Sequence, residues 1–175
     1  MTLMHKKFRS YQVAVIALMV AATLLVAPKV YAFINEAISM AQEAATPYVK
    51  EGFEVREDDW SGEVEPGKPL LVKHQLFRGN EYWFWAGTSW PGSSVEVGIF
   101  DSNEKSIALE TFENGHNAGV RALPQKTGTY FIRVKVEYDP KKAAQEERDA
   151  GFLPAADGVE GFEGTVDWGL IYGYR

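Results

Sequence analysis

Apolar and polar residues alternate along most of this chain. The clearest run is Tyr130–Tyr138, where every second residue from Tyr130 to Val136 is apolar and the residues between are mostly charged. Successive side chains of a strand point to opposite faces, so this run predicts a half-buried β-strand. Shorter runs predict further strands at Gly52–Arg56, Trp60–Val64, Leu70–Phe77, Glu81–Ala86, Val95–Asp101, Ser106–Phe112, Ala118–Leu123 and Asp167–Tyr174. Turn residues separate these strands, and this spacing is typical of an antiparallel sandwich or barrel.

The segment Leu70–Thr88 carries the densest aromatic sequence. It is expected to form a β-hairpin, with two strands joined by a tight turn at Arg78–Asn80, where glycine and asparagine accept positive φ most easily. In the second strand Tyr82 and Phe84 share one face, and Trp83 and Trp85 share the other. Both faces are aromatic, so we expect this strand to be covered on both sides.

Helical periodicity precedes the strands. In residues 33–47 the residues Ile34, Ala37, Ile38, Ala41 and Ala45 fall on one face of a helix. Thr46–Pro47 is expected to end it, because the residue before proline avoids the α region. The helix is expected to pack on the domain or continue from the segment before it. The alternative is a helix that binds a partner.

The N-terminal residues 1–32 have the layout of a signal peptide. A basic start is followed by Val13–Ala27, fifteen apolar residues without charge, and then by Pro28. Val30 and Ala32 are suited to a signal peptidase, so cleavage is predicted after Ala32. The alternative is an uncleaved anchor, which would be the protein's only contact with a membrane. In either case the domain is expected to be exported, to the periplasm or beyond the cell.

The remaining residues, 48–175, are assigned to one β-sandwich domain with a long charged insertion at 139–165. Pro140–Asp149 within the insertion could form one or two helical turns. A loop of this length is usually functional or mobile.

Charge limits the partners of this domain. The chain has a net charge of −6, but residues 1–32 hold four basic and no acidic residues, so the rest carries a net charge of −10. Such a domain is a poor candidate for binding nucleic acid. The chain has no cysteine, which excludes disulfides and thiolate metal sites.

No motif for catalysis or for a cofactor is found, so we expect a protein that is not an enzyme. His74 and His116 lack a second histidine at metal-ligand spacing, and Asp58–Asp59 and Glu146–Glu147 are typical of solvated turns and faces. Calcium is the best metal candidate, at the turn that contains Asp101 and Asn103 or at Glu57–Asp59. Turn formation explains both clusters more simply.

The tryptophans are the other candidates for binding. Exposed rings of a β-sandwich can stack on sugars, whereas rings in a core cannot. Trp83 and Trp85 would be about 7 Å apart along one face, a spacing that suits both a sugar platform and a two-sheet core. Trp90, in a Ser-Trp-Pro-Gly loop, is expected to be the most exposed tryptophan. Trp60 and Trp168 complete the set of five.

Three motifs resemble the bacterial pre-peptidase C-terminal domain. They are Gly79–Phe84, which is similar to a GxxYxF strand, Val97–Asp101, a strand that ends in Asp, and Thr127–Val134, which is similar to a TGTYxVRV strand. The resemblance covers roughly residues 62–138. It implies a jelly-roll-like sandwich of about eight strands with a binding or chaperone-like accessory role. Since no enzyme domain is recognisable in this sequence, such a role would be exerted in trans.

Two classes of function are therefore expected. The first is an exported, non-catalytic binding protein that engages a protein partner of the cell envelope or a secreted protein. The second is a stand-alone carbohydrate-binding module that uses Trp90, Trp83 or Trp85 on a polysaccharide.

Overall fold

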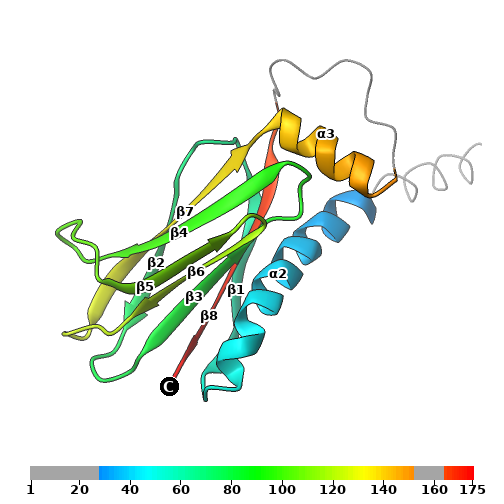
Figure 1. Cartoon of the computed structure of the whole chain (residues 1–175). Helices are drawn as coiled ribbons and strands as arrows, with labels where there is room; N and C mark the ends of the chain where they lie inside the picture. Colours follow the sequence, from blue (N-terminus) through cyan, green and yellow to red (C-terminus); the bar gives the residue numbers. More distant parts are fainter. Residues whose placement is uncertain (1–27, 152–163) are drawn as a thin grey trace, which may run out of the picture. The chain divides into compact units, whose positions relative to one another are not determined.

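The computed structural model describes residues 28–151 and 164–175 (Figure 1). The chain divides into two compact units, Met1–Ala32 and Phe33–Arg175, and the β-strands all belong to the second. The apolar run Val13–Ala27 and the end of the charged insertion lie outside the described residues.

Two antiparallel sheets make up the fold. The five-stranded sheet has the order β1-β8-β3-β6-β5, and the three-stranded sheet has the order β2-β7-β4. The strands are β1 (Glu54–Val64), β2 (Leu70–Leu76), β3 (Tyr82–Gly87), β4 (Ser93–Phe100), β5 (Ala108–Asn114), β6 (Asn117–Ala122), β7 (Gly128–Tyr138) and β8 (Val166–Tyr174). The expectation of an all-β, sandwich-like fold is confirmed.

The strand pairs join early strands of the chain to late ones. β1 pairs with β8, β2 with β7, and β3 with β6. β4 also meets the chain just before β5, where the Ile107 N–H donates to the Ile99 carbonyl at 3.1 Å. β5 itself then turns to the other sheet and pairs with β6. β3 also pairs with β8, and β4 with β7, which completes the five-stranded and the three-stranded sheet.

The core lies between the inner faces of the two sheets. Its largest fully buried side chains include Phe84, Leu76, Ile99, Ile132 and Leu170. The alternating pattern of β7 predicted this face correctly: Tyr130, Ile132, Val134 and Val136 are all buried.

The predicted hairpin of Leu70–Thr88 is wrong, although both of its strands exist. The turn forms as expected, with φ of +98° at Gly79 and a hydrogen bond from the Asn80 N–H to the Phe77 carbonyl. β2 and β3, however, belong to different sheets. The two strands are buried to different extents, and this places them in different sheets. Every residue of β3 is buried on both faces, as expected, whereas Leu71 and its neighbours on one face of β2 are exposed.

Helix α2 (Pro28–Val49) covers the outer face of the five-stranded sheet along β3 and β8 (Figure 1). Ala37, Ala41 and Ala45 are buried, as the helical periodicity predicted. The approach is close because two strands carry glycine beneath the helix. A Cβ atom on Gly87 would lie 2.3 Å from the Ala37 carbonyl oxygen, and one on Gly169 would lie 2.8 Å from the Ile38 nitrogen.

The predicted end of this helix at Thr46–Pro47 is wrong, because α2 includes Pro47 in its last turn. Tyr48 lies one residue beyond the proline and packs its ring 4.3 Å from the ring of Trp83. The helix ends instead at Val49, and Gly52 beyond it has a φ of +97° that lets the Phe53 N–H return to the Tyr48 carbonyl. The packing of the half-buried Tyr48 against Trp83 outweighs the preference of Thr46, the residue before proline, for an extended conformation.

The charged insertion begins with helix α3 (Pro140–Asp149), a longer helix than the one or two turns expected. Asp139 caps it by accepting a hydrogen bond from the Lys141 N–H at 2.8 Å. Ala143 is the buried residue of this helix and packs against Gly92, where an added Cβ would come within 2.5 Å of it.

Candidate functional site

A bulge in β1 forms one wall of the site. The two strands predicted at Gly52–Arg56 and Trp60–Val64 are one strand, interrupted where the register with β8 shifts between Val55 and Asp59. Three residues of β1 oppose the single residue Tyr172 of β8 there, so Arg56, Glu57 and Asp58 leave the regular ladder. Bulges commonly re-aim side chains beside binding sites.

The bulge borders a cavity of about 430 Å³, which we call the bulge cleft. It is lined by Glu57, Asp58, Asp59, Trp60 and His74. β1 and β2 are edge strands of the two sheets, and the contact between the Trp60 and His74 rings, 5.3 Å between centroids, places the two edges close together. The cleft therefore lies between the edges of the two sheets, on the side of the sandwich formed by β1 and β2.

Aromatic rings form the inner wall of the bulge cleft. The His74 ring lies 4.4 Å from that of Tyr172 on β8 and 6.1 Å from that of Phe84 on β3. The Trp60 ring lies 5.8 Å from that of Tyr172. Trp60 and His74 remain half-buried, whereas Tyr172 is only 7% exposed. The rings that meet here come from four strands, and Tyr172 on β8 is far from the other three in the sequence.

The electrostatics of this wall favour neutral rings beside an anionic rim. Burial lowers the pKa of His74, and this outweighs the opposite effect of the Asp58 carboxylate. Burial also raises the pKa of Tyr172, as does Asp58, to which the Tyr172 hydroxyl donates at 3.4 Å. At neutral pH the cleft thus combines uncharged rings with the exposed carboxylates of Glu57, Asp58 and Asp59. An aromatic wall with an acidic rim suits a cationic group of a ligand.

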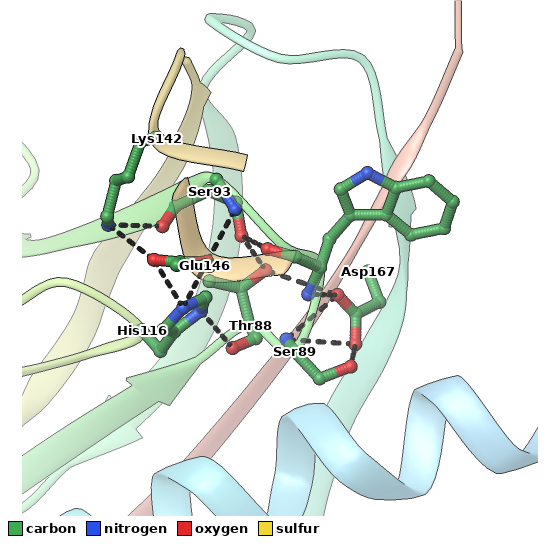
Figure 2. Close-up of polar contacts among 9 residues, drawn as sticks. Thr88, Ser89, Ser93, His116, Lys142, Glu146 and Asp167 are labelled. Atoms are coloured by element: carbon green, nitrogen blue, oxygen red, sulfur yellow. Dashed lines mark hydrogen bonds and ion pairs between the residues drawn. The ribbon is translucent and has the colours of Figure 1, made fainter. Parts of the chain in front are cut away.

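A second polar cluster lies near the start of α3 and is shown in Figure 2. Its centre is Asp167 on β8, which is 2% exposed. This carboxylate accepts hydrogen bonds from the Thr88 hydroxyl, from the N–H and hydroxyl of Ser89, and from the Trp90 N–H. A buried carboxylate with this many donors fixes the loop after β3 in one conformation.

His116 and Glu146 join this cluster to α3 (Figure 2). His116 Nε2 lies 3.2 Å from a Glu146 carboxylate oxygen, and its Nδ1 lies 3.2 Å from the Thr88 carbonyl oxygen. Burial would raise the pKa of Glu146, but the Gly92 N–H, His116 and the Lys142 ammonium together lower it. The carboxylate is therefore ionised and holds α3 against the end of the sandwich.

This second cluster contains serine, histidine and aspartate but not the order of contacts that activates a nucleophile. A nucleophilic serine needs its hydroxyl within hydrogen-bond reach of the base. Here the Ser89 hydroxyl is bonded to Asp167 at 2.5 Å, while both ring nitrogens of His116 are directed to Thr88 and Glu146. We therefore assign the cluster to the structure of the loop and of α3.

Of the two interpretations of Trp83 and Trp85, a sugar platform and a core, the structure supports the core. The two rings share one face and stack at 6.0 Å, as expected, but they are 1% and 0% exposed beneath α2. Trp90 is half-buried and packs against the main core, and it and Trp60 are more exposed than the other three tryptophans. None of these three rings lines the bulge cleft.

In the turn with the predicted calcium ligands, one carboxylate oxygen of Asp101, Oδ1, is used within the turn itself. The Asp101 carboxylate accepts hydrogen bonds from the N–H groups of Asn103, at 2.8 Å, and Lys105, at 3.0 Å. Both bonds lower the pKa of Asp101, with Lys105 the larger cause. Asp101 and Asn103 also line a cavity of about 690 Å³. Among the described residues, no group of three or more histidine or acidic side chains is placed to hold a metal ion.

The sequence contained the parts of the bulge cleft but gave no sign of their association. Trp60, His74 and the pair Asp58–Asp59 stood out separately as an aromatic, an isolated histidine and a solvated turn. Only the pairing of β1 with β8 and the approach of β2 bring them together. Tyr172 carries no local signal at all.

Comparisons with known proteins do not assign this chain to a family, because neither family models nor curated proteins give a match. Within residues 28–151 and 164–175, no helix has the length and apolarity needed to cross a bilayer.

Proposed function

We propose that this chain is an exported, non-catalytic accessory protein that binds a basic segment of a partner protein in the bulge cleft. The partner would be another protein of the cell envelope or a secreted protein. The signal-like N-terminus supports export. The observation that carries the binding role is the combination, in one cleft, of an aromatic wall and three exposed carboxylates.

The chemistry of the cleft selects a lysine or arginine side chain. Its apolar stem can lie on the half-exposed indole of Trp60 while its charge meets Asp58 and Glu57. A cation over a tryptophan ring contributes about 0.5–2 kcal/mol, depending on how far it is desolvated. His74 supports this choice because its lowered pKa keeps the ring uncharged near neutral pH, so that it does not repel a cation.

We further propose that the domain is jelly-roll-like, in keeping with the resemblance to the pre-peptidase C-terminal domain. The pairs β1–β8, β2–β7 and β3–β6, together with the contact between β4 and the start of β5, support this topology. Such a domain would present the bulge cleft at an open side between two edge strands.

A site-specific crosslinking experiment in intact cells tests the function. A photo-crosslinking amino acid at Glu57, on the rim of the cleft, should capture one protein reproducibly. The same amino acid at Gln42, which is exposed on α2, serves as the matched control and should not capture it. Sequencing of the crosslinked peptide should place a lysine or arginine beside Glu57.

Substitution of the cleft gives the second arm of this experiment. Trp60→Ala, combined with the crosslinker at Glu57, should reduce capture at least tenfold. Cell fractionation on the same samples shows whether the chain is exported. The proposal fails if the folded, exported chain captures nothing from Glu57, or if capture is the same with Trp60→Ala.

A further inference from the structure

A second surface, on the outer face of the three-stranded sheet, combines basic and apolar side chains. The register of β2, β7 and β4 places Lys73, Phe131 and Phe100 in one row across the sheet. The neighbouring row consists of Leu71, Arg133 and Gly98. Cations and apolar side chains therefore alternate on this face, and Leu71 is 65% exposed.

Two cations of this face, Arg133 and Lys73, lie against aromatic rings. The Arg133 guanidinium lies 4.8 Å from the centroid of the Phe100 ring, and the Lys73 ammonium lies 5.9 Å from that of Phe131. Gly98 makes room for the first contact, because a Cβ atom there would be 3.1 Å from the Phe100 ring. In the described part of the chain neither cation forms an ion pair.

Arg133 also borders a hollow of about 350 Å³ in this face, which we call the outer hollow. This volume lies at the lower end of the range for small-molecule sites. Leu71, Phe100 and Phe131 supply its apolar surface. The Asp101 and Glu104 carboxylates and the Ser102 hydroxyl supply oxygen atoms at its rim.

We propose that the outer hollow binds an acidic sugar unit of a polysaccharide, such as a uronic acid residue. A guanidinium group recognises a carboxylate with two parallel hydrogen bonds. The carboxylates and the hydroxyl at the rim accept hydrogen bonds from sugar hydroxyl groups. The leucine and phenylalanine side chains pack against the C–H face of the sugar ring.

The mixture of groups in the outer hollow distinguishes this ligand from other anions. A glutamate-rich peptide or a phosphatidate headgroup carries its charge with few hydroxyl donors, so Asp101 and Glu104 would repel it without compensation. A neutral sugar would leave the guanidinium of Arg133 without an anionic partner. A unit with one carboxylate and several hydroxyl groups satisfies both kinds of residue.

Affinity electrophoresis of the full chain in gels that contain polygalacturonate tests this proposal. The chain should be retarded in these gels at about 0.15 M salt and not in gels that contain dextran, a neutral polymer. The domain carries net negative charge, so overall charge attraction cannot cause retardation by a polyanion. Arg133→Gln should weaken the apparent affinity at least tenfold, whereas Lys50→Gln, at an exposed lysine outside the hollow, should leave it unchanged.

Further arms separate the sources of the ligand and the two proposals. Competition by free galacturonate would show that a single unit is sufficient, and competition only by longer fragments would show that the polymer is recognised. Trp60→Ala should not change retardation, because it alters the bulge cleft alone. The proposal is overturned if polygalacturonate causes no retardation, if Arg133→Gln binds as the unaltered chain does, or if acidic vesicles or an oligoglutamate peptide bind and polygalacturonate does not.

Discussion

Substitution of Gly87 by alanine should loosen helix α2 from the sheet. The added Cβ would lie 2.3 Å from the Ala37 carbonyl oxygen and 2.7 Å from the Ala41 nitrogen, both atoms of the helix backbone. A carbon–oxygen contact of this type is ordinarily no shorter than about 3.3 Å, so the helix must retreat by about 1 Å. Backbone atoms on both sides leave no flexible side chain to absorb the strain.

A retreat of this size has a calculable cost. A gap of about 0.5–1 Å loses a quarter to a half of the dispersion energy between the surfaces that it separates. The surfaces concerned include Ala41, Ala45 and Tyr48 on one side and Trp83 and Trp85 on the other. Overpacking of a well-filled core typically costs about 1–3 kcal/mol. We therefore expect a loss of about 2 kcal/mol in the free energy of unfolding and a fall in Tm of roughly 4–8 °C.

Thermal and urea unfolding, followed by tryptophan fluorescence, measure this effect. Gly128→Ala is the matched control, because an added Cβ there meets nothing within 4 Å and its φ is not in the left-handed region. The emission of Gly87→Ala should also shift to longer wavelength, since Trp83 and Trp85 lose cover. An unchanged Tm and emission for Gly87→Ala would show that α2 does not lie on this sheet in solution.

Two further predictions concern buried polar groups. Asp167→Asn should lower the free energy of unfolding by about 2–4 kcal/mol, because the amide nitrogen would face a group that now donates a hydrogen bond to the carboxylate. Urea unfolding measures this loss, with Asp59→Asn as the exposed control. Equal stability of the two variants would contradict the prediction. The lowered pKa of His74 means that the unfolded chain binds this proton more readily, so its contribution to stability is complete above pH 6.5 and is lost as the pH falls below that value. His74→Phe should therefore lose less stability than the unaltered protein between pH 7.5 and pH 5, and parallel pH profiles in urea unfolding would refute this assignment.

The sequence predicts the elements of this protein better than their associations. β7 and the buried face of α2 follow from local periodicity, since alternation and helical spacing are properties of neighbouring residues. The separation of β2 from β3 does not, because a tight turn is compatible with a hairpin and with a crossing between sheets. That choice depends on which faces find cover elsewhere in the chain.

The bulge cleft shows the same limit at the level of a site. Trp60 and Tyr172 are more than one hundred positions apart in the sequence, and only the ladder between β1 and β8 brings them together. The two-residue excess in β1 leaves no mark in composition or spacing. The tryptophans of β3 attract attention in the sequence because they lie two positions apart, yet this spacing reflects their common burial beneath a helix.

The acidic bulge has a consequence for the solubility of the protein. A long edge strand such as β1 offers unpaired backbone groups to the strands of other molecules, and this is a common start of aggregation. Glu57, Asp58 and Asp59 place like charges where another strand would have to pair, and the register shift breaks the regular ladder that pairing requires. The same residues would thus serve recognition and keep the molecules apart. Neutral substitutions made to weaken binding should therefore be checked for self-association, because a partner site and a barrier to aggregation would be lost together.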